Sequence, residues 1–261
     1  MTTIARLLDQ RSVGDVTLRM EHSGPAVIRE FGSSKLRIPS GSTEAILINT
    51  SGGLAGGDRV AVNATAGEGV SLTLTSQTAE RVYRSLGPPA EVKVALKVEA
   101  GASLFWLPQE TILFEQSALR RTLDVDVHGQ STFLAAESLV FGRYEMGEDI
   151  HTLDLFDRWT IRRDGTLLHA EQFKLGPDFP NSVATLGSHR AVATVLLVSP
   201  EAEARLAAVR EALSQTDGAS GWNGKLVARL VAKDGFHLRK TLIKILIALL
   251  GHNSLPKTWT F

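Results

Sequence analysis

No cysteine occurs among the 261 residues, and this absence excludes two kinds of structure. The chain can hold no disulfide framework and no thiolate metal site. A transition metal would therefore have to bind through imidazole, carboxylate, amide or water ligands. Histidines are dispersed and form no H-x-H or H-E-x-x-H motif, so a zinc hydrolase site has no support in the sequence. They are His22, His128, His151, His169, His189, His237 and His252.

An excess of charge of one sign is also missing. Lysine and arginine together number 28, as do aspartate and glutamate, and this balance argues against a basic surface for nucleic acid or anionic lipid. Long apolar runs are absent as well, because the longest, Ile245–Leu250, is far too short to span a membrane. The N-terminus carries charges from Arg6 onward and lacks the apolar core of a secretion signal. We therefore expect a cytoplasmic protein.

Alternation of apolar and polar residues dominates the first three quarters of the chain. Leu123, Val125 and Val127, for example, alternate with polar residues, as half-buried strands do. Asp164-Gly165 between two such stretches predicts a β-hairpin. No linker and no repeat of 20–50 residues is evident, which favours one domain over residues 1–261. The pattern alone predicts a mainly β fold, either a sandwich or a barrel.

Two segments near the C-terminus have helical spacing. Residues Glu201–Gln215 follow Ser199 and Pro200, a pair typical of an N-cap and a first helical position. The second segment, Phe236–Leu250, carries an apolar stripe and is followed by Gly251, a stop signal. Because this helix is apolar over most of its surface, we expect it to pack in the core, with contact to a partner protein as the alternative.

The most conspicuous motif holds four glycines, Gly52, Gly53, Gly56 and Gly57. Gly52 and Gly57 have the spacing of a phosphate-binding P-loop, but Asp58 follows where that loop needs lysine. The paired glycines do not match the dinucleotide fingerprint G-x-G-x-x-G either. They predict a tight turn with positive φ. Asp58 then either caps backbone amides beside this turn or faces a cavity.

A second polar segment, Thr75–Ser85, carries positive charges and one aromatic ring. Arg81, Tyr83 and Arg84 in it could bind an anion or a partner surface. The alternative is an exposed turn or strand end without such a role. The residues alone leave these two interpretations equally open.

Two further segments each contain a carboxylate near a turn. In Phe105–Phe114, Gln109 and Glu110 follow a strand end and lie beside apolar residues, so a buried carboxylate there would be paired or functional. In Gly142–Glu148, Arg143 can form an ion pair with either glutamate of the segment. A paired, structural role is the simpler interpretation of both. Residue chemistry alone gives no active site.

Together these segments resemble one family, the urease accessory proteins of the UreD (UreH) type. Four motifs occur in the expected order, and a fifth closes the chain. The motifs are NTSGGLAGGD (49–58), QTAERVYRS (77–85), WLPQETILF (106–114), GRYEMGE (142–148) and LPKTW (255–259). The resemblance extends from about Gly14 to the C-terminus.

This resemblance implies a scaffold without a catalytic reaction of its own. Family members work with a UreF-type accessory protein and a UreG-type GTPase on apo-urease, into which nickel is inserted. The family fold is an elongated, β-helix-like or stacked-sheet architecture with two α-helices toward the C-terminus. The resemblance also implies that nickel passes through the interior in transit, with no tightly bound cofactor. The carboxylates in the motifs are our candidates for lining that route: Asp58, Glu110 and Glu148.

Other motif residues are expected to shape or present this region. They are Gly52, Gly53, Gly56, Gly57, Gln77, Tyr83, Arg84, Arg143 and Gly147. Two alternatives to a nickel-insertion scaffold remain. One is an enzyme with dispersed acidic residues, such as a carbohydrate-active β-helix, although no carboxylate pair at strand spacing supports it. The other is an interaction module that never handles metal.

Overall fold

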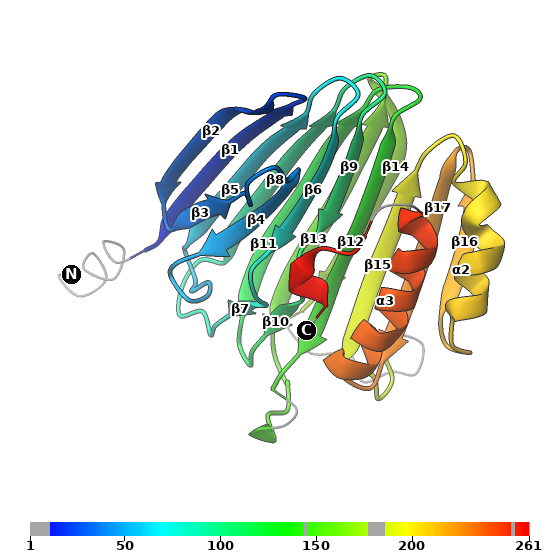
Figure 1. The fold of residues 1–261 in the computed structure, drawn as a ribbon. Coiled ribbons are helices and arrows are strands. Elements are labelled where there is room, and N and C mark those ends of the chain that lie inside the picture. Colours follow the sequence, from blue (N-terminus) through cyan, green and yellow to red (C-terminus); the bar gives the residue numbers. More distant parts are fainter. Residues whose placement is uncertain (1–10, 144–145, 177–185, 252–253, 261) are drawn as a thin grey trace.

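The protein is a two-sheet solenoid. The computed structural model describes residues 11–143, 146–176, 186–251 and 254–260. Within them, sheet A has the strand order β14-β13-β11-β8-β5-β1-β2, and sheet B has the order β16-β17-β15-β12-β9-β6-β4-β3, with β7 and β10 attached beside β12 (Figure 1). The chain alternates between the sheets from β4 to β13, making about four turns. The mainly β, helix-like winding expected from the resemblance is confirmed, and it replaces the sandwich or barrel that alternation alone suggested.

The strands of sheet A have these bounds: β1 (Val13–Glu21), β2 (Gly24–Gly32), β5 (Arg59–Ala66), β8 (Ala90–Val98), β11 (Ala118–Val127), β13 (Asp154–Arg163) and β14 (Thr166–Leu175). Those of sheet B, with β7 and β10, are β3 (Ser34–Arg37), β4 (Glu44–Asn49), β6 (Ser71–Ser76), β7 (Glu80–Val82), β9 (Ser103–Leu107), β10 (Thr111–Leu113), β12 (Thr132–Phe141), β15 (Ala191–Val198), β16 (Gly218–Trp222) and β17 (Lys225–Ala232).

Successive coils stack in parallel. Val62 of β5 lies beside Val94 of β8, which in turn lies beside Leu123 of β11. In sheet B, Leu72 pairs with Leu104 and Leu104 with Phe133. The inward side chains of both sheets form the main core between them. The sequence shows no repeat because a coil needs only inward apolar residues at alternate positions, and different residues meet that need in each coil.

The two ends of the solenoid differ. At one end, turns of four residues (67–70, 99–102 and 128–131) connect sheet A to sheet B. Each turn is closed by one backbone hydrogen bond, for example from Ala102 N to Glu99 O at 3.1 Å. At the other end, the connections from sheet B to sheet A are residues 50–58, 77–89, 108–117 and 142–153, and we call this the loop end. In Figure 1 the loop end lies at the bottom, beside β7 and β10.

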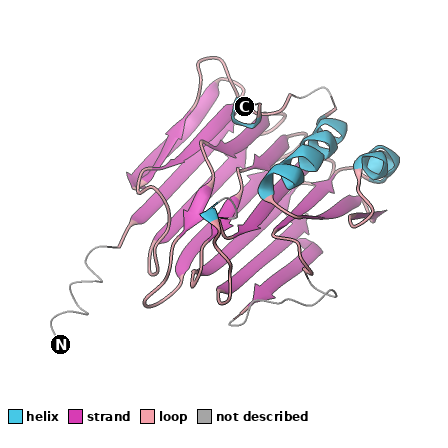
Figure 2. Ribbon diagram, turned by 90° about the horizontal axis from the view of Figure 1, so that it is seen from below, coloured by secondary structure: helices cyan, strands magenta, loops and turns pink. Residues whose placement is uncertain are grey.

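Two helices cover the outer face of sheet B near its β15–β17 edge (Figure 2). They are α2 (Leu206–Ala212), which follows the 3-10 helix η2 (Glu203–Arg205), and α3 (Gly235–Leu250); a further 3-10 helix, η3 (Lys257–Trp259), lies near the C-terminus. A second core lies between the helices and sheet B. Among the described residues, no helix is long and apolar enough to cross a membrane.

The helix predictions have different outcomes. The second predicted helix is confirmed as α3, and its apolar stripe packs in the core. Asp234 caps the first turn of α3 by accepting a hydrogen bond from His237 N at 2.8 Å. Gly251 ends the helix with a positive φ. The prediction of a helix over Glu201–Gln215 is wrong in its bounds, because α2 covers only half of that range. The chain leaves the helix early, since Asp217 accepts hydrogen bonds from the backbone and side chain of Ser214 and fixes a turn there.

The predicted hairpin is confirmed. β13 and β14 pair in antiparallel register on either side of Asp164-Gly165. Both turn residues have positive φ, as a two-residue hairpin turn requires.

Candidate functional site

The four sequence motifs are the four successive connections of the loop end. The winding brings them together although they are far apart in the sequence. β7 pairs with β10, β10 pairs with β12, and Leu54 forms a bridge with Val82, so the connections are tied to one another by backbone hydrogen bonds. The loop end is therefore one continuous surface built from all four motifs.

A row of side chains runs across these connections. Tyr83 Oη donates to Gly52 O at 2.9 Å, from one coil to the next. The Tyr83 ring meets Phe114 edge-on at 5.3 Å, and the Arg143 guanidinium lies over Phe114 at 4.5 Å from the ring centroid. Gly53 has positive φ, and a Cβ there would lie 2.4 Å from the Tyr83 ring, so only glycine fits. Four of the predicted motif residues thus belong to one packed row.

The rest of the glycine motif forms a turn that leads into Asp58. A Cβ on Gly56 would lie 2.1 Å from Ser85 Oγ, and Gly57 has positive φ. The Asp58 side chain is 5% exposed, and its two oxygens accept hydrogen bonds from Ser12 N and Ala55 N, each at 2.8 Å. Of the two roles considered from the sequence, these contacts match the cap on backbone amides.

Arg84 and Gly147 occupy supporting positions. Arg84 forms an isolated β-bridge with Ser117, which ties the second motif to the connection that carries the third. Gly147 has positive φ, and a Cβ there would meet no atom within 4 Å, so this glycine serves the turn rather than a close contact. Both residues therefore shape the loop end.

The third motif anchors the C-terminal segment. Gln109 Nε2 donates to Thr258 O at 3.0 Å, and Arg239 of α3 donates to Gln109 Oε1 at 2.7 Å. Glu110 lies 3.5 Å from the same guanidinium. Trp259 Nε1 donates to the carbonyl that ends β9. Glu110 is therefore paired, and its motif joins the loop end to the closing LPKTW segment.

Glu148 is paired as well. Its carboxylate accepts from Arg143 Nε and Arg143 N, each at 2.9 Å, and from Glu115 N at 3.3 Å. Burial alone would raise the pKa of Glu148, but these hydrogen bonds hold that pKa below its ordinary value. The other glutamate considered as a partner of Arg143, Glu145, lies outside the described residues.

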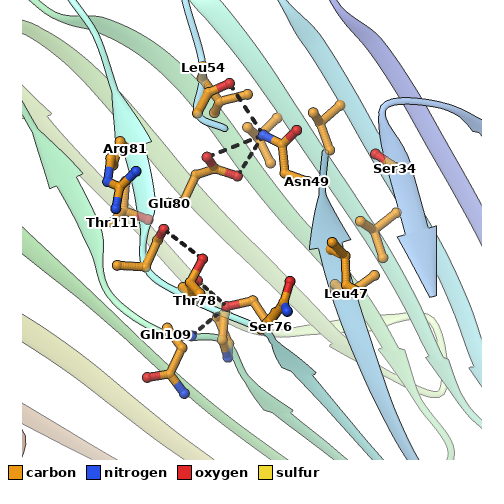
Figure 3. A pocket seen from close by; sticks show the side chains of 18 of the residues that line it. Ser34, Leu47, Asn49, Leu54, Ser76, Thr78, Glu80, Arg81, Gln109 and Thr111 are labelled. Carbon is orange, nitrogen blue, oxygen red and sulfur yellow. Dashed lines mark hydrogen bonds between the residues drawn. The ribbon is translucent and has the colours of Figure 1, made fainter. Parts of the chain in front are cut away.

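A cavity of about 170 Å³ lies between the sheets next to the loop end (Figure 3). Gly52, Gly53, Gln77 and Glu80 are among the residues that line it. The carboxylate of Glu80 accepts hydrogen bonds from Asn49 Nδ2 at 3.1 and 3.2 Å. Burial raises the pKa of Glu80 above its ordinary value. Asp58, Glu110 and Glu148 are not among the lining residues, and their part in metal transit stays a prediction.

A second cavity of about 180 Å³ adjoins the first, because Arg121 and Glu137 line both. Glu171 also lines the second cavity and pairs with Arg229 at 2.8 Å. His169 Nε2 lies 3.4 Å from the Glu171 carboxylate. Burial would raise the pKa of Glu171, but the contacts with His169 and Arg229 lower it. The two cavities together extend from the loop end toward the side of the interior formed by β14 and β17.

Between the cavities lies a buried group that we call the interior ion cluster: Arg121, Glu137 and Asp157. Arg121 Nη2 contacts both carboxylates, that of Glu137 at 3.0 Å. Trp106 Nε1 and Trp159 Nε1 donate to Glu137 at 2.7 and 3.2 Å. Burial raises the pKa of Glu137. None of the sequence predictions included this cluster, although a glutamate inside the apolar run of β12 was a visible sign of it.

Comparison with known proteins decides the family. The sequence profile described as UreD urease accessory protein matches residues 4–260. The chain belongs to the UreD family. The urease accessory protein UreD of Mesorhizobium japonicum is 46% identical over 239 residues, covering 88% of this chain and 85% of that protein. UreD of Rhizobium leguminosarum bv. viciae is 44% identical over 271 residues and covers 99% of both chains.

Membership of the UreD family places the chain among urease accessory proteins and not among carbohydrate-active β-helix enzymes. The UreD-type motifs recognised in the sequence are the loop end of the solenoid. Within the described part of this UreD-family chain, no three His, Asp or Glu side chains converge as a closed metal site. Of the carboxylates that line the two cavities, Glu80 accepts from an amide, Glu171 contacts Arg229 and His169, and Glu137 and Asp157 share Arg121.

Proposed function

We propose that the chain is a scaffold for nickel insertion into apo-urease, working in the cytoplasm with a UreF-type accessory protein and a UreG-type GTPase. In this proposal the GTPase carries out GTP hydrolysis, and the chain itself catalyses no reaction. Nickel is cargo that enters at one cavity and leaves at the other. The loop end, where all four motifs meet, is the surface that we assign to protein contacts.

The observation that carries the proposal is the pair of adjoining interior cavities. Carboxylates occur in both, with Glu80 in the first and Glu171 in the second. Nickel accepts carboxylate, imidazole and water ligands. A conduit must bind its ion weakly enough to release it, which open sites with one or two carboxylates allow and a closed site with four protein ligands would prevent. The arrangement therefore suits transit better than storage.

Co-expression tests this function. The tagged chain is expressed with UreF, UreG and apo-urease subunits from its own organism, and co-purification and nickel-dependent urease activity are measured. We expect a complex, and activity that depends on the chain. Full urease activity without the chain, or no association with any partner, would contradict the scaffold role.

Charge-neutral variants separate the scaffold from the route. Glu80→Gln and Glu171→Gln keep the shape of each side chain, so the complex should still form while urease activation falls at limiting nickel. Asp126→Asn, on the exposed outer side of β11, is the matched control and should activate normally. If both interior variants activate urease as well as the control does, the chain acts only as an interaction module. The same assay tests Asp58→Ala, Glu110→Ala and Glu148→Ala, after each variant is shown to be folded.

A further inference from the structure

Arg121 stands where the two interior cavities meet. It belongs to β11 of sheet A, and its carboxylate partners come from β12 of sheet B and from β13. Arg121 and Glu137 line both cavities, whereas Asp157 lines only the second. Arg121 and Glu137 therefore belong to a wall that the two cavities share, and an ion that crosses directly at this wall meets the guanidinium. A positive charge at that point opposes the passage of a cation.

The cluster is buried and only partly satisfied. Glu137 and Asp157 are 4% and 6% exposed, and Arg121 is 6% exposed. Two carboxylates share one guanidinium. Asp157 Oδ1 and Arg121 Nε are both buried without a hydrogen-bond partner. Buried polar atoms are almost always paired, so such atoms beside a cavity point to a ligand or to a second arrangement of the side chains.

We propose that a divalent cation binds between Glu137 and Asp157 by displacing the Arg121 guanidinium from the wall that the two cavities share. The cation would then meet the free Asp157 Oδ1 and the Glu137 oxygen that Arg121 has left. The site uses oxygen ligands, and water from the cavities completes the coordination. This inference rests on the proposed function, because it concerns the control of the same interior route.

Arg121 has a place to go when it is displaced. Its Nη1 already donates to Thr111 Oγ1 at 3.3 Å, and Thr111 lines the first cavity. In the proposed displacement the guanidinium rotates toward Thr111, which releases both carboxylates and retains this hydrogen bond. Meanwhile Trp106 and Trp159 hold Glu137 in place through their ring N–H groups. The moving part is therefore the arginine, while Glu137 stays in place.

Nickel binding by the purified full-length chain tests the proposal. The chain is prepared without a polyhistidine tag and titrated with Ni²⁺ alone by calorimetry. Arg121→Met removes the competing charge and keeps an apolar stem, and it should bind one Ni²⁺ at least ten-fold more tightly than the parent. Arg121→Lys keeps the positive charge and should bind as the parent does. Arg120→Met, which removes the neighbouring surface arginine paired with Asp154, is the matched control and should change nothing.

Adding Glu137→Gln and Asp157→Asn to Arg121→Met should abolish the gained site. The proposal is overturned if Arg121→Met binds nickel no more tightly than the parent, or if its gain survives in the triple variant. If Arg121→Met fails to fold, fluorescence of the parent chain still tests the proposal. Ni²⁺ should quench fluorescence from Trp106 and Trp159 at high concentration, and Asp157→Asn should lose that quenching; equal quenching in both proteins would overturn the proposal.

The outcomes separate this inference from the proposed function. If the chain is needed for urease activation but Arg121→Met gains no nickel site, only the displacement of Arg121 is refuted. If Arg121→Met gains the site while the chain is dispensable for activation, the scaffold role fails and the cation site stands.

Discussion

Asp58→Ala should destabilise the protein strongly, because the buried carboxylate satisfies two backbone amides. The substitution removes the hydrogen bonds from Ser12 N and Ala55 N, both at 2.8 Å, and leaves both donors without an acceptor. A hydrogen bond to a charged group contributes roughly 1.5–3 kcal/mol. The free energy of unfolding should therefore fall by about 3 kcal/mol or more, which lowers Tm by at least roughly 6 °C for a chain of this size.

Thermal unfolding followed by circular dichroism measures this effect. Asp126→Ala makes the same chemical change at an exposed position of β11 and should alter the free energy of unfolding by about 0.5 kcal/mol or less. Urease activation is assayed in parallel at a temperature where both variants are folded. A normal Tm for Asp58→Ala together with lost activation would refute the capping argument and would assign this carboxylate to the metal route.

Three further predictions concern the glycine turn, the first cavity and the interior ion cluster. Gly53→Ala should lower Tm more than Gly52→Ala, since both have positive φ but only the Gly53 position meets the Tyr83 ring. Burial raises the pKa of Glu80 above its ordinary value of about 4.5, so the folded state binds the Glu80 proton more tightly than the unfolded state does. The free energy of unfolding therefore falls as the pH rises and Glu80 loses this proton. Glu80→Gln should therefore raise Tm, relative to the parent, more at about pH 7.5 than at about pH 4.5. Replacing the interior ion cluster with uncharged residues should raise Tm and abolish urease activation.

Residue patterns within short segments predicted the strands, the hairpin turn and the longer helix. Alternating residues became strands, Asp164-Gly165 became a two-residue turn, and the stripe of Phe236–Leu250 became α3. Each of these features depends on residues close together in the sequence. The helix expected over Glu201–Gln215 was overextended, because the tertiary turn at Asp217 ends it and helical spacing does not report such contacts.

The winding of the chain could not be predicted from residue patterns. Gly52 and Tyr83 are hydrogen-bonded at a separation of 31 residues, and Phe114 and Arg143 continue the same row in the next two coils. Apolar and polar residues alternate in the same way in a solenoid strand and in a sandwich strand, so this pattern cannot distinguish the two folds. Only the resemblance of the ordered motifs to a family supplied the winding. The structure then explains the motifs, since all four are the same connection in successive coils.

The interior ion cluster was missed for a different reason. Functional chemistry was expected in polar segments, whereas these charges stand inside apolar strands. Arg121 shares its strand face with Leu119 and Leu123, both of which are buried. Charged residues at positions whose alternation points inward are therefore the informative ones in such a fold, and glutamate within the apolar run of β12 is another example.

The energetics of the same cluster favour a functional role for it over a stabilising one. Taking three ionisable groups out of water carries a penalty that their mutual attraction often fails to offset, and apolar replacement of such groups commonly stabilises a protein by roughly 1–4 kcal/mol. In the triple variant Arg121→Met/Glu137→Gln/Asp157→Leu, the new side-chain amide at position 137 keeps an acceptor for one tryptophan N–H while the charges disappear. A higher Tm with no urease activation would mean that the protein retains a destabilising cluster because the route needs it. A lower Tm would instead show that the cluster holds sheets A and B together.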